Sequence, residues 1–543
     1  MSRAHRRAPS FVVAAARILL TCVVIVVAGQ TCALAATAAA FGDKEHQRAE
    51  KALREGEFES AEKMFREMLQ KNTRDIAARL GLSFALLKQR KNQEAFDAAA
   101  RVITIEPTSP RAHALLGYAL LASGDFQLSV EEFRTALSFK EDEALAIAGL
   151  AMVDFYENRI NASLSGLRRA VFIDGDEPDY HFNLGQVAAR NERYGEAADA
   201  YERFLRIAPR TDADRRARIR GLIDFLRYLG TQRNLISITG PSRSRVSFEI
   251  VNNRPIIKVR INDNKEPLRF VVDTGAGMCV VSTTAADRLG LRSVARGGNA
   301  RAVGGSGSFE IVYGFLRSLE IGEARIENVP IYIRKFFNEQ EKIDGYIGLS
   351  VVAKYLTSID YGERTMTLLR DDARDKAMAA ITAQSGIDIP IRITSSGFWS
   401  GEVQLDGVTK PLNFIMDTGA TITVVSAALA AREDLSRHAQ STKLTVYGAA
   451  GVTDDVQMLL LPRISFGAHA RPRIPAAVLD MDAINETAGF EQTGIVGGNV
   501  LRHYRVTFDF QRASVRLEPL GPQQQPAADD LQRVAAPIIA NQP

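Results

Sequence analysis

With 543 residues, the chain is longer than one hydrophobic core normally serves, so two to four domains are expected. Its 46% apolar and 24% charged residues are those of an ordinary globular protein. The net charge of +4 is small for this length, and no dense Lys/Arg run occurs beyond the extreme N-terminus, which argues against nucleic-acid binding.

Residues 1–40 have the layout of an export signal. Several arginines precede the apolar run ILLTCVVIVVAG (18–29), and small residues follow around Ala33-Leu34-Ala35. The run is short for a membrane span. The sequence predicts a cleaved signal peptide, or else an uncleaved N-terminal anchor as the only membrane attachment. Either way the body of the protein is expected to be exported, as a periplasmic or secreted protein. Cleavage near Ala35 would remove Cys22 and Cys32 and leave Cys279 as the single cysteine, so no internal disulfide is expected.

Residues 42–230 carry a helical repeat with a period of 34. Small residues recur at that interval without a slip, and a second small residue stands twelve positions before each of them. The first series is Ala61, Ala95, Ser129, Ser163 and Ala197, and the second is Ala49, Ser83, Gly117, Ala151 and Gly185. This period and pattern resemble tetratricopeptide repeats, about five of them. The amphipathic segment 212–229 is predicted to be a capping helix.

The resemblance to tetratricopeptide repeats implies a groove that binds a protein partner, and the sequence names no residue in that groove. A spacer or a self-association surface is the alternative. Residues 231–246 are polar, with Gly and Ser, and are predicted to be a linker to a different kind of structure.

Residues 247–520 contain one β-rich pattern written twice. Short runs rich in Val, Ile and Phe alternate with Gly, Asn and Asp, which predicts β-strands. LRFVVDTGAGMCVVS (268–282) returns 144 residues later as LNFIMDTGATITVVS (412–426). The offset becomes 145 at Pro330/Pro475 and 149 at Gly348/Gly497, so insertions fall between the motifs. Lobes at 247–372 and 386–520 are therefore predicted, joined by a linker at 373–385.

Each copy drives an aspartate into the end of an apolar strand, where a carboxylate must be neutral, paired or functional. In each copy a Gly-rich hairpin tip follows, and then an apolar pair before a glycine. This order resembles the retropepsin and pepsin class of aspartic proteases. The fold class expected is thus multidomain, with an all-α tetratricopeptide solenoid followed by an all-β bilobal acid-protease domain.

The resemblance implies a catalytic role for Asp273 and Asp417, which would meet within one chain as a pseudo-dimer. Two carboxylates sharing one proton can activate a water molecule and polarise a peptide carbonyl, as the paired aspartates of acid proteases do. Supporting roles follow for Thr274 and Thr418 across the lobe interface, for the turn glycines Gly275 and Gly419, and for the loop glycines Gly348 and Gly497.

The hairpin tips are predicted to be flaps that close over substrate, or alternatively plain turns. Their residues are Gly304, Gly305 and Gly307 in the first lobe and Tyr447, Gly448 and Gly451 in the second. Tyr447 has Val303 as its counterpart, so the two flaps are expected to differ. The residues after the loop glycine also differ, as Leu349-Ser350 against Gly498-Asn499, and so does the strand position occupied by Cys279 in one lobe and Thr423 in the other.

The function predicted is an exported aspartic endopeptidase whose repeats recruit a protein substrate or partner. One alternative is a non-catalytic scaffold that binds a partner through the repeats and peptides in a protease-like cleft. Another is a site formed between two chains. For Asp273 or Asp417 alone, the alternative is a plain turn residue. The seven histidines show no metal-binding spacing, so neither metal nor cofactor is expected. Asp360 and Asp509 are read as structural, and the polar tail 521–543 as disordered.

Overall fold

The structure is a computed structural model that describes residues 44–302, 308–338, 340–370, 373–374 and 386–521. It divides into two compact units, one ending at Pro107 and the other beginning at Thr108. Both the segment predicted to direct export and the tail from residue 522 lie outside the described residues.

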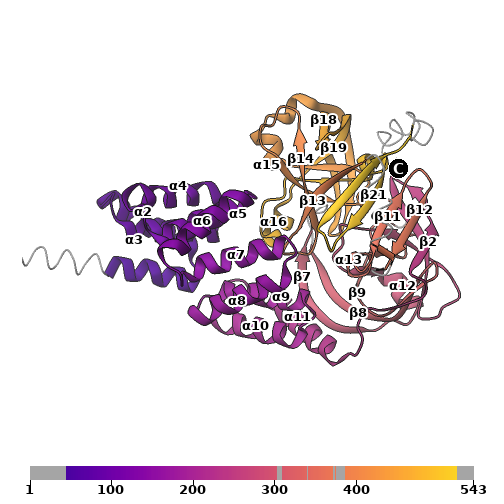
Figure 1. Ribbon diagram of the computed structural model, residues 1–543, viewed down its shortest axis with the longest axis horizontal. Helices are drawn as coiled ribbons and strands as arrows, with labels where there is room; N and C mark the ends of the chain where they lie inside the picture. The colour runs from indigo at the N-terminus through magenta and orange to yellow at the C-terminus, as the bar shows by residue number, and fades with distance from the viewer. Residues whose placement is uncertain (1–43, 303–307, 339, 371–372, 375–385, 522–543) are drawn as a thin grey trace, which may run out of the picture. The chain divides into compact units, whose positions relative to one another are not determined.

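The described part of the first unit, residues 44–107, forms two helix pairs. Figure 1 shows these helices. They are residues 44–55, α2 (Phe58–Lys71), α3 (Ile76–Lys88) and α4 (Asn92–Ile105). The small residues of the repeat lie at the helix contacts: Ala61 and Ala95 are fully buried, and the Ser83 hydroxyl donates to the Ala95 carbonyl at 2.9 Å. The 34-residue period therefore marks the positions where paired helices approach most closely.

The second unit begins with three more helix pairs and one longer helix. These are α5 (Pro110–Ala122), α6 (Phe126–Phe139), α7 (Ala144–Tyr156), α8 (Ile160–Ile173), α9 (Pro178–Arg190), α10 (Tyr194–Ile207) and α11 (Ala213–Thr231). A Cβ on Gly117 would lie 2.7 Å from the Phe133 ring, and one on Gly185 would lie 2.9 Å from Tyr201. Small and large members of the repeat thus interlock as the pattern predicted.

The first lobe follows α11. Its strands are β1 (Ser237–Thr239), β2 (Arg243–Ser247), β3 (Glu249–Val251), β4 (Arg254–Ile261), β5 (Leu268–Val272), β6 (Cys279–Ser282), β7 (Ser293–Arg301), β8 (Ser308–Ile321), β9 (Ala324–Arg334), β10 (Gly345–Ile347), β11 (Leu356–Asp360) and β12 (Thr365–Leu369), with short helices α12 (Thr283–Arg288) and α13 (Leu349–Val352). Strand β1 and most of β2 lie within 231–246, the segment expected to be a linker. β2 is an edge strand paired with β12, and most of its side chains are exposed or partly exposed. Its sequence is polar because these positions face solvent.

The second lobe repeats this order. Its strands are β13 (Ile387–Ile393), β14 (Trp399–Leu405), β15 (Leu412–Met416), β16 (Thr423–Ser426), β17 (Ala439–Gly448), β18 (Gly451–Phe466), β19 (His469–Leu479), β20 (Gly494–Val496), β21 (Tyr504–Asp509) and β22 (Ser514–Pro519), with helices α15 (Ala427–Arg432), η1 (Leu435–His438), α16 (Asp482–Ala488) and α17 (Gly498–Leu501).

The two lobes share one strand arrangement around the Asp-Thr-Gly motifs. Their central orders are β6-β10-β5-β4 and β16-β20-β15-β14. In each, the strand before the motif pairs in parallel with the strand that ends at the glycine loop, β5 with β10 and β15 with β20. Strand β10 lies between β5 and β6, the strands on either side of the motif, and β20 lies in the same way between β15 and β16. Because β10 runs parallel to β5 and β20 to β15, the motif and the glycine loop follow neighbouring strand ends.

A shared antiparallel sheet joins the lobes, in the order β13-β22-β21-β11-β12-β2. β11 of the first lobe pairs directly with β21 of the second. Asp360 accepts a hydrogen bond from Arg505 Nε at 2.8 Å, and buried Asp509 is ion-paired with Arg374. Both aspartates hold this sheet and its turns together, which is the structural role expected of them.

Helix α11 packs on the β7–β8 hairpin of the first lobe. A Cβ on Gly221 would lie 2.0 Å from the Arg296 carbonyl oxygen, so the two backbones are in direct contact. Phe225 stacks on Tyr313 with ring centroids 4.2 Å apart, and Arg218 donates to the Asn299 carbonyl at 3.0 Å. The segment predicted only to cap the repeats therefore also supports a hairpin of the first lobe.

The repeats from α5 onward also contact the second lobe. Tyr156, at the end of the largely buried α7, packs edge-on against Phe490 at 5.2 Å and lies 3.3 Å from the Ser395 hydroxyl. Asn158 donates to the Phe510 carbonyl at 3.0 Å. Part of the repeat surface is thus used within the chain itself.

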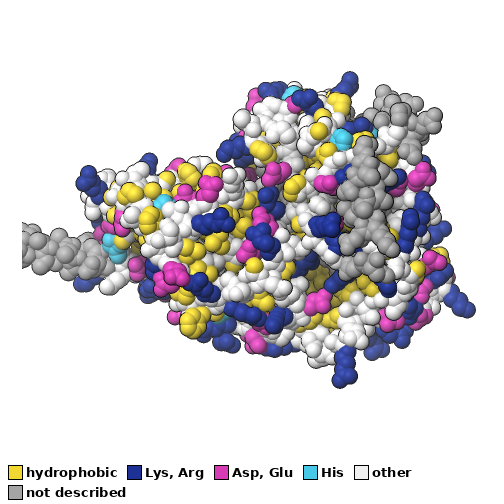
Figure 2. All heavy atoms as spheres, in the orientation of Figure 1, with side chains coloured by type: hydrophobic (Ala, Val, Ile, Leu, Met, Phe, Trp, Pro, Cys, Tyr) yellow, Lys and Arg dark blue, Asp and Glu magenta, His cyan; other side chains and the backbone are white. Residues whose placement is uncertain are grey.

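Charges of both signs are interspersed over the face shown in Figure 2, in line with the small net charge. Within the described residues, no helix combines the length and apolar character that a membrane span requires.

Candidate active site

The two Asp-Thr-Gly loops are held in the same way by their own lobes. The backbone N–H of Asp273 donates to the Ile347 carbonyl, and that of Asp417 donates to the Val496 carbonyl, both at 3.0 Å. The N–H of Gly275 donates to Asp273 Oδ1 at 2.8 Å, and the N–H of Gly419 donates to Asp417 Oδ1 at 2.7 Å. Each carboxyl is therefore fixed at the end of a buried apolar strand.

The two aspartates meet across the lobe interface, close enough for each carboxyl to shift the pKa of the other. A Cβ on Gly275 would lie 2.3 Å from Asp417 Oδ2, and one on Gly419 would lie 2.5 Å from Asp273 Cγ. Glycine is needed in both loops because each backbone touches the opposite carboxyl. Asp273 and Asp417 form their pair within one chain, which is the arrangement of the pseudo-dimer.

The two threonines bind the loops to each other. Each buried hydroxyl donates to a carbonyl of the opposite strand, from Thr274 to Met416 at 2.6 Å and from Thr418 to Val272 at 2.7 Å. Each hydroxyl also accepts the other threonine's N–H, at 3.0 and 3.2 Å. This four-bond network holds the carboxyls in register.

Burial and proximity set the charge of the pair. Burial raises the pKa of the Asp273 carboxyl well above its usual range, and the neighbouring Asp417 charge raises it further. Burial also raises the pKa of Asp417, but the N–H groups of Gly419 and Ala420 offset part of that rise. Asp417 accepts two backbone N–H bonds and Asp273 one, an arrangement that favours the negative charge on Asp417 and the proton on Asp273.

The loop glycines Gly348 and Gly497 allow a close backbone approach to the motif. A Cβ on Gly348 would lie 2.4 Å from the Met278 carbonyl oxygen, and one on Gly497 would lie 2.5 Å from the Ile422 carbonyl carbon. Both residues have φ values near −90°, which any residue adopts, so space and not conformation requires glycine here.

The residue two positions after each loop glycine, Ser350 or Asn499, forms a brace by hydrogen-bonding the strand that follows the motif. In the second lobe, buried Asn499 accepts from the Thr423 N–H at 2.8 Å and from its hydroxyl at 2.9 Å, and donates to the Pro475 carbonyl at 2.8 Å. In the first lobe, the Ser350 hydroxyl takes the place of the amide, accepting from the Cys279 N–H at 3.3 Å. Cys279 is buried, as expected, and burial raises the pKa of its thiol to about 11.

The flap residues divide into a described and an undescribed set. Gly304, Gly305 and Gly307 lie outside the described residues. In the second lobe, Tyr447 pairs with Val452 and Gly448 with Gly451, so these residues close a tight turn between β17 and β18. The side chains of Tyr447 and Val452 are each 40% exposed, unusually for apolar groups of this size.

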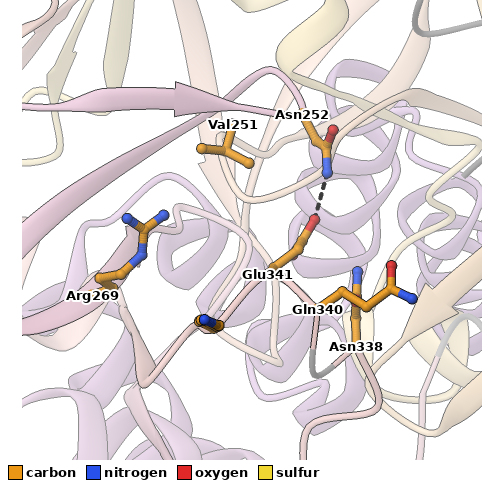
Figure 3. A pocket seen from close by; sticks show the side chains of 7 residues that line it. Val251, Asn252, Arg269, Asn338, Gln340 and Glu341 are labelled. Atoms are coloured by element: carbon orange, nitrogen blue, oxygen red, sulfur yellow. Dashed lines mark hydrogen bonds between the residues drawn. The ribbon is translucent and has the colours of Figure 1, made fainter.

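A surface pocket of about 430 Å³ lies away from the dyad, lined by Val251, Asn252, Arg269, Asn338, Gln340, Glu341 and Lys342 (Figure 3). The pocket is open to solvent, and neither Asp273 nor Asp417 lines it, so it is separate from the paired aspartates. Within the described part of the chain, no group of three or more His, Cys, Asp or Glu side chains is placed to hold a metal ion.

Two residues near the site were not selected from the sequence. Gly221 shows its role only through the contact between α11 and β7. Arg334, at the end of β9, occupies the position of Leu479 in the second lobe. A comparison of the two copies residue by residue, beyond their motifs, would have found this change from an apolar to a charged side chain.

Two lobes of one β design, with paired Asp-Thr-Gly loops at their interface, define a bilobal acid-protease fold. The aspartyl protease family profile matches residues 257–351 and 401–500, and tetratricopeptide repeat profiles match 52–117, 110–143 and 178–211. The chain therefore carries tetratricopeptide repeats followed by a retropepsin-like aspartyl protease domain, in the order that the sequence predicted. A search of curated proteins gives no match.

Several solved repeat proteins are similar to the helical part. The thermophilic TPR protein TTC0263 of Thermus thermophilus is 18% identical, covering 34% of this chain and 98% of that one, with a TM-score of 0.30. PilF of Pseudomonas aeruginosa is 14% identical, covering 35% and 84%, with a TM-score of 0.27. MamA 41-end from Desulfovibrio magneticus RS-1 is 19% identical, covering 31% and 94%, with a TM-score of 0.23.

Proposed function

We propose that the protein is an exported aspartic endopeptidase that hydrolyses peptide bonds with water, using Asp273 and Asp417 as a catalytic pair. The observation that carries the proposal is the buried contact between these two carboxyls, held by the network of Thr274 and Thr418. A turn aspartate of a scaffold needs neither a second carboxyl against it nor a cross-lobe brace.

The chemistry follows from where the proton lies. Ionised Asp417 accepts a proton from a water molecule, while protonated Asp273 donates to the carbonyl oxygen of the scissile bond. Water oxygen bonds to the carbonyl carbon and gives a neutral tetrahedral intermediate. The proton on Asp417 then passes to the departing nitrogen as the C–N bond breaks, and Asp273 regains its proton as the carbonyl re-forms. The pair thus returns to its starting state.

The β17–β18 hairpin supplies the second element of the proposal. An extended peptide between the lobes can pair with flap backbone, as an added strand does, and the exposed Tyr447 and Val452 would cover it. Closure of such a flap excludes water other than the reacting molecule. The repeats are proposed to recruit protein substrates or partners, and because α11 touches the other hairpin, a partner bound there would be held beside the catalytic lobes.

The export part of the proposal rests on the sequence of residues 1–40 alone. Cell fractionation of the full chain, with N-terminal sequencing of the product, tests both export and cleavage of the signal. Protein recovered in the cytoplasm with residues 1–40 intact would contradict it.

Activity is tested with Asp417→Asn and Asp273→Asn in the full chain, assayed on a peptide library from acid to neutral pH. Both variants should lose cleavage while keeping the wild-type circular dichroism spectrum. Asp287→Asn is the matched control, because Asp287 is an exposed aspartate on α12 of the same lobe. Cleavage that persists in Asp417→Asn would contradict the proposal, as would a wild type inactive at every pH and unable to bind statine-type inhibitors.

A further inference from the structure

Arg334 is a cation held between the first-lobe hairpin and the catalytic loop. Its guanidinium lies 5.8 Å from the ring centroid of Phe309, on β8 of that hairpin. It lies 5.7 Å from the rings of Phe336 and Tyr346. Tyr346 directly precedes Ile347, whose carbonyl accepts the N–H of Asp273. Arg334 therefore lies between Phe309 of the hairpin and Tyr346, which precedes the residue hydrogen-bonded to Asp273.

The surroundings of the Arg334 guanidinium, within the part of the chain that the structure describes, supply it with no salt-bridge partner. Its Nε is buried without a hydrogen-bond acceptor, and among the described residues no carboxylate lies within ion-pair distance of it. The side chain as a whole is partly exposed. Burying a hydrogen-bond donor without an acceptor costs free energy. Because the Arg334 side chain is partly exposed, a group of a bound molecule can reach it.

Burial raises the pKa of Tyr346 and the charge of the Glu341 carboxylate contributes to that rise, but this carboxylate is paired with residues other than Arg334. Glu341 is ion-paired with buried Arg254 and accepts from Asn252 Nδ2 at 2.6 Å, the dashed contact in Figure 3. Arg254 is thus paired with Glu341, whereas Arg334 forms no such ion pair among the described residues. The attraction between Arg334 and Asp273 also acts on the pKa values of both groups.

The second lobe has an apolar cluster at the matched place. Arg334 pairs with Ser282 and Leu479 pairs with Ser426, so strand register makes Arg334 and Leu479 equivalent. The sequence offsets between the lobes align Phe336 with Met481 and Tyr346 with Ile495. Leu479, Met481 and Ile495 belong to one buried cluster. Ala420 and Ile422 of the Asp417 loop and Val446 of the flap pack against that cluster. This cluster marks the region under the flap where a substrate side chain would contact the lobe.

We propose that Arg334 is a specificity-determining residue that binds an acidic side chain, Asp or Glu, of the substrate on the first-lobe side of the scissile bond, while the second lobe takes an apolar one. This inference rests on the proposed function and names its substrate class. A guanidinium binds a carboxylate with two parallel hydrogen bonds, and the aromatic rings around Arg334 orient its plane without competing for its N–H donors.

Cleavage-site sequencing of a randomised peptide library tests the inference. With the wild type, Asp and Glu should be enriched at one position on one side of the cleaved bond. Arg334→Leu, which introduces the residue of the second lobe, should lose that enrichment. For a peptide pair differing only by Glu or Gln at that position, the Glu/Gln ratio of kcat/KM should fall about 10- to 100-fold in Arg334→Leu. Arg334→Lys should restore part of it.

The matched control is Arg317→Leu, which removes the same charge from an exposed position on β8. It should leave the Glu/Gln ratio unchanged. The inference is overturned if the wild type shows no acidic preference or Arg334→Leu retains it. It is also overturned if Arg334→Leu alters the pH profile of Glu and Gln peptides alike and leaves the Glu/Gln ratio of kcat/KM unchanged, because the residue would then act only on the dyad.

A binding experiment separates this inference from the proposed function. Anisotropy of a labelled Glu peptide and its Gln twin is measured with Asp417→Asn, and with the same variant carrying Arg334→Leu. Tighter binding of the Glu peptide that depends on Arg334 supports the inference even if the wild type cleaves nothing. Cleavage by the wild type with equal binding of both peptides would leave the endopeptidase standing and overturn the role of Arg334.

Discussion

Thr274 and Thr418 form a reciprocal pair across the lobe interface, in which each buried hydroxyl accepts the other's N–H and donates to the strand beyond it. The pair connects the two lobes at the residues next to the carboxyls of Asp273 and Asp417. Interface stability and active-site geometry therefore depend on the same four hydrogen bonds.

Thr418→Ala should destabilise the catalytic domain by about 2–4 kcal/mol, because it leaves the Val272 carbonyl and the Thr274 N–H buried without partners. Trp399, the single tryptophan, is fully buried in β14, so its fluorescence during urea unfolding reports this domain. Thr418→Ser keeps the hydroxyl and is the control, with a loss of roughly 1 kcal/mol or less for the methyl group. Equal losses in the two variants would show that the hydroxyl is not the stabilising group.

The second prediction compares the braces behind the two glycine loops. Asn499→Ala removes the acceptor of the buried Thr423 N–H and the donor to the Pro475 carbonyl, and should cost about 2–4 kcal/mol. Ser350→Ala removes a 3.3 Å hydrogen bond accepted from the Cys279 N–H and a weak 3.7 Å one donated to its sulfur, and should cost about 1 kcal/mol. The same tryptophan signal measures both. A larger loss for Ser350→Ala would reverse this ranking of the lobes.

Sequence periodicity predicted most of the architecture for a physical reason. Ala61 and Ala95 recur at 34 residues because helix pairs need small residues at closest approach, and such a constraint survives in the pattern. The Asp273 and Asp417 motifs could be paired because each lobe builds the same local turn, so their constant offset is visible without a structure. Asp360 and Asp509 were recognised in the same way, as matched positions in closing strands.

Residues whose role depends on a contact between distant segments could not be predicted in this way. Gly221 looks like any glycine in an amphipathic helix until β7 is seen to lie against it. Arg334 has no motif, and its importance comes from the register of β9 on β6 and from the side chains around it. The strands within 231–246 were missed because edge strands carry polar residues on the exposed side.

The third prediction concerns stability and pH. Because burial raises the pKa of Asp273, the folded state binds its proton more tightly than the unfolded state does. The stabilising contribution of this group is therefore greatest at low pH, and it is lost as pH rises from the usual value of 3.8 through the raised pKa of Asp273. Asp273→Asn removes this titration, so the variant should unfold at a higher urea concentration than the wild type at neutral pH.

The difference between Asp273→Asn and the wild type should shrink as the pH falls toward the usual range of an aspartate, where both proteins carry a neutral group at that position. Asp287→Asn, at an exposed site, should track the wild type throughout. A wild type more stable than Asp273→Asn at neutral pH would contradict the raised pKa. The active wild type should likewise lose activity on the alkaline side, where the pair no longer holds a proton.

The last prediction concerns the support of the first-lobe hairpin by α11. Gly221→Ala places a methyl group against the Arg296 carbonyl and the Gly297 Cα, contacts of 2.0 and 2.3 Å that no side-chain rotation relieves. The helix and β7 must separate, so amide hydrogen exchange in β7 should accelerate and the KM for peptides should rise. Gly195→Ala is the matched control, since nothing lies within 4 Å of that position on α10. It should be neutral or stabilise the helix by up to about 1 kcal/mol. Unchanged exchange in β7 of Gly221→Ala would show that α11 does not restrain the hairpin.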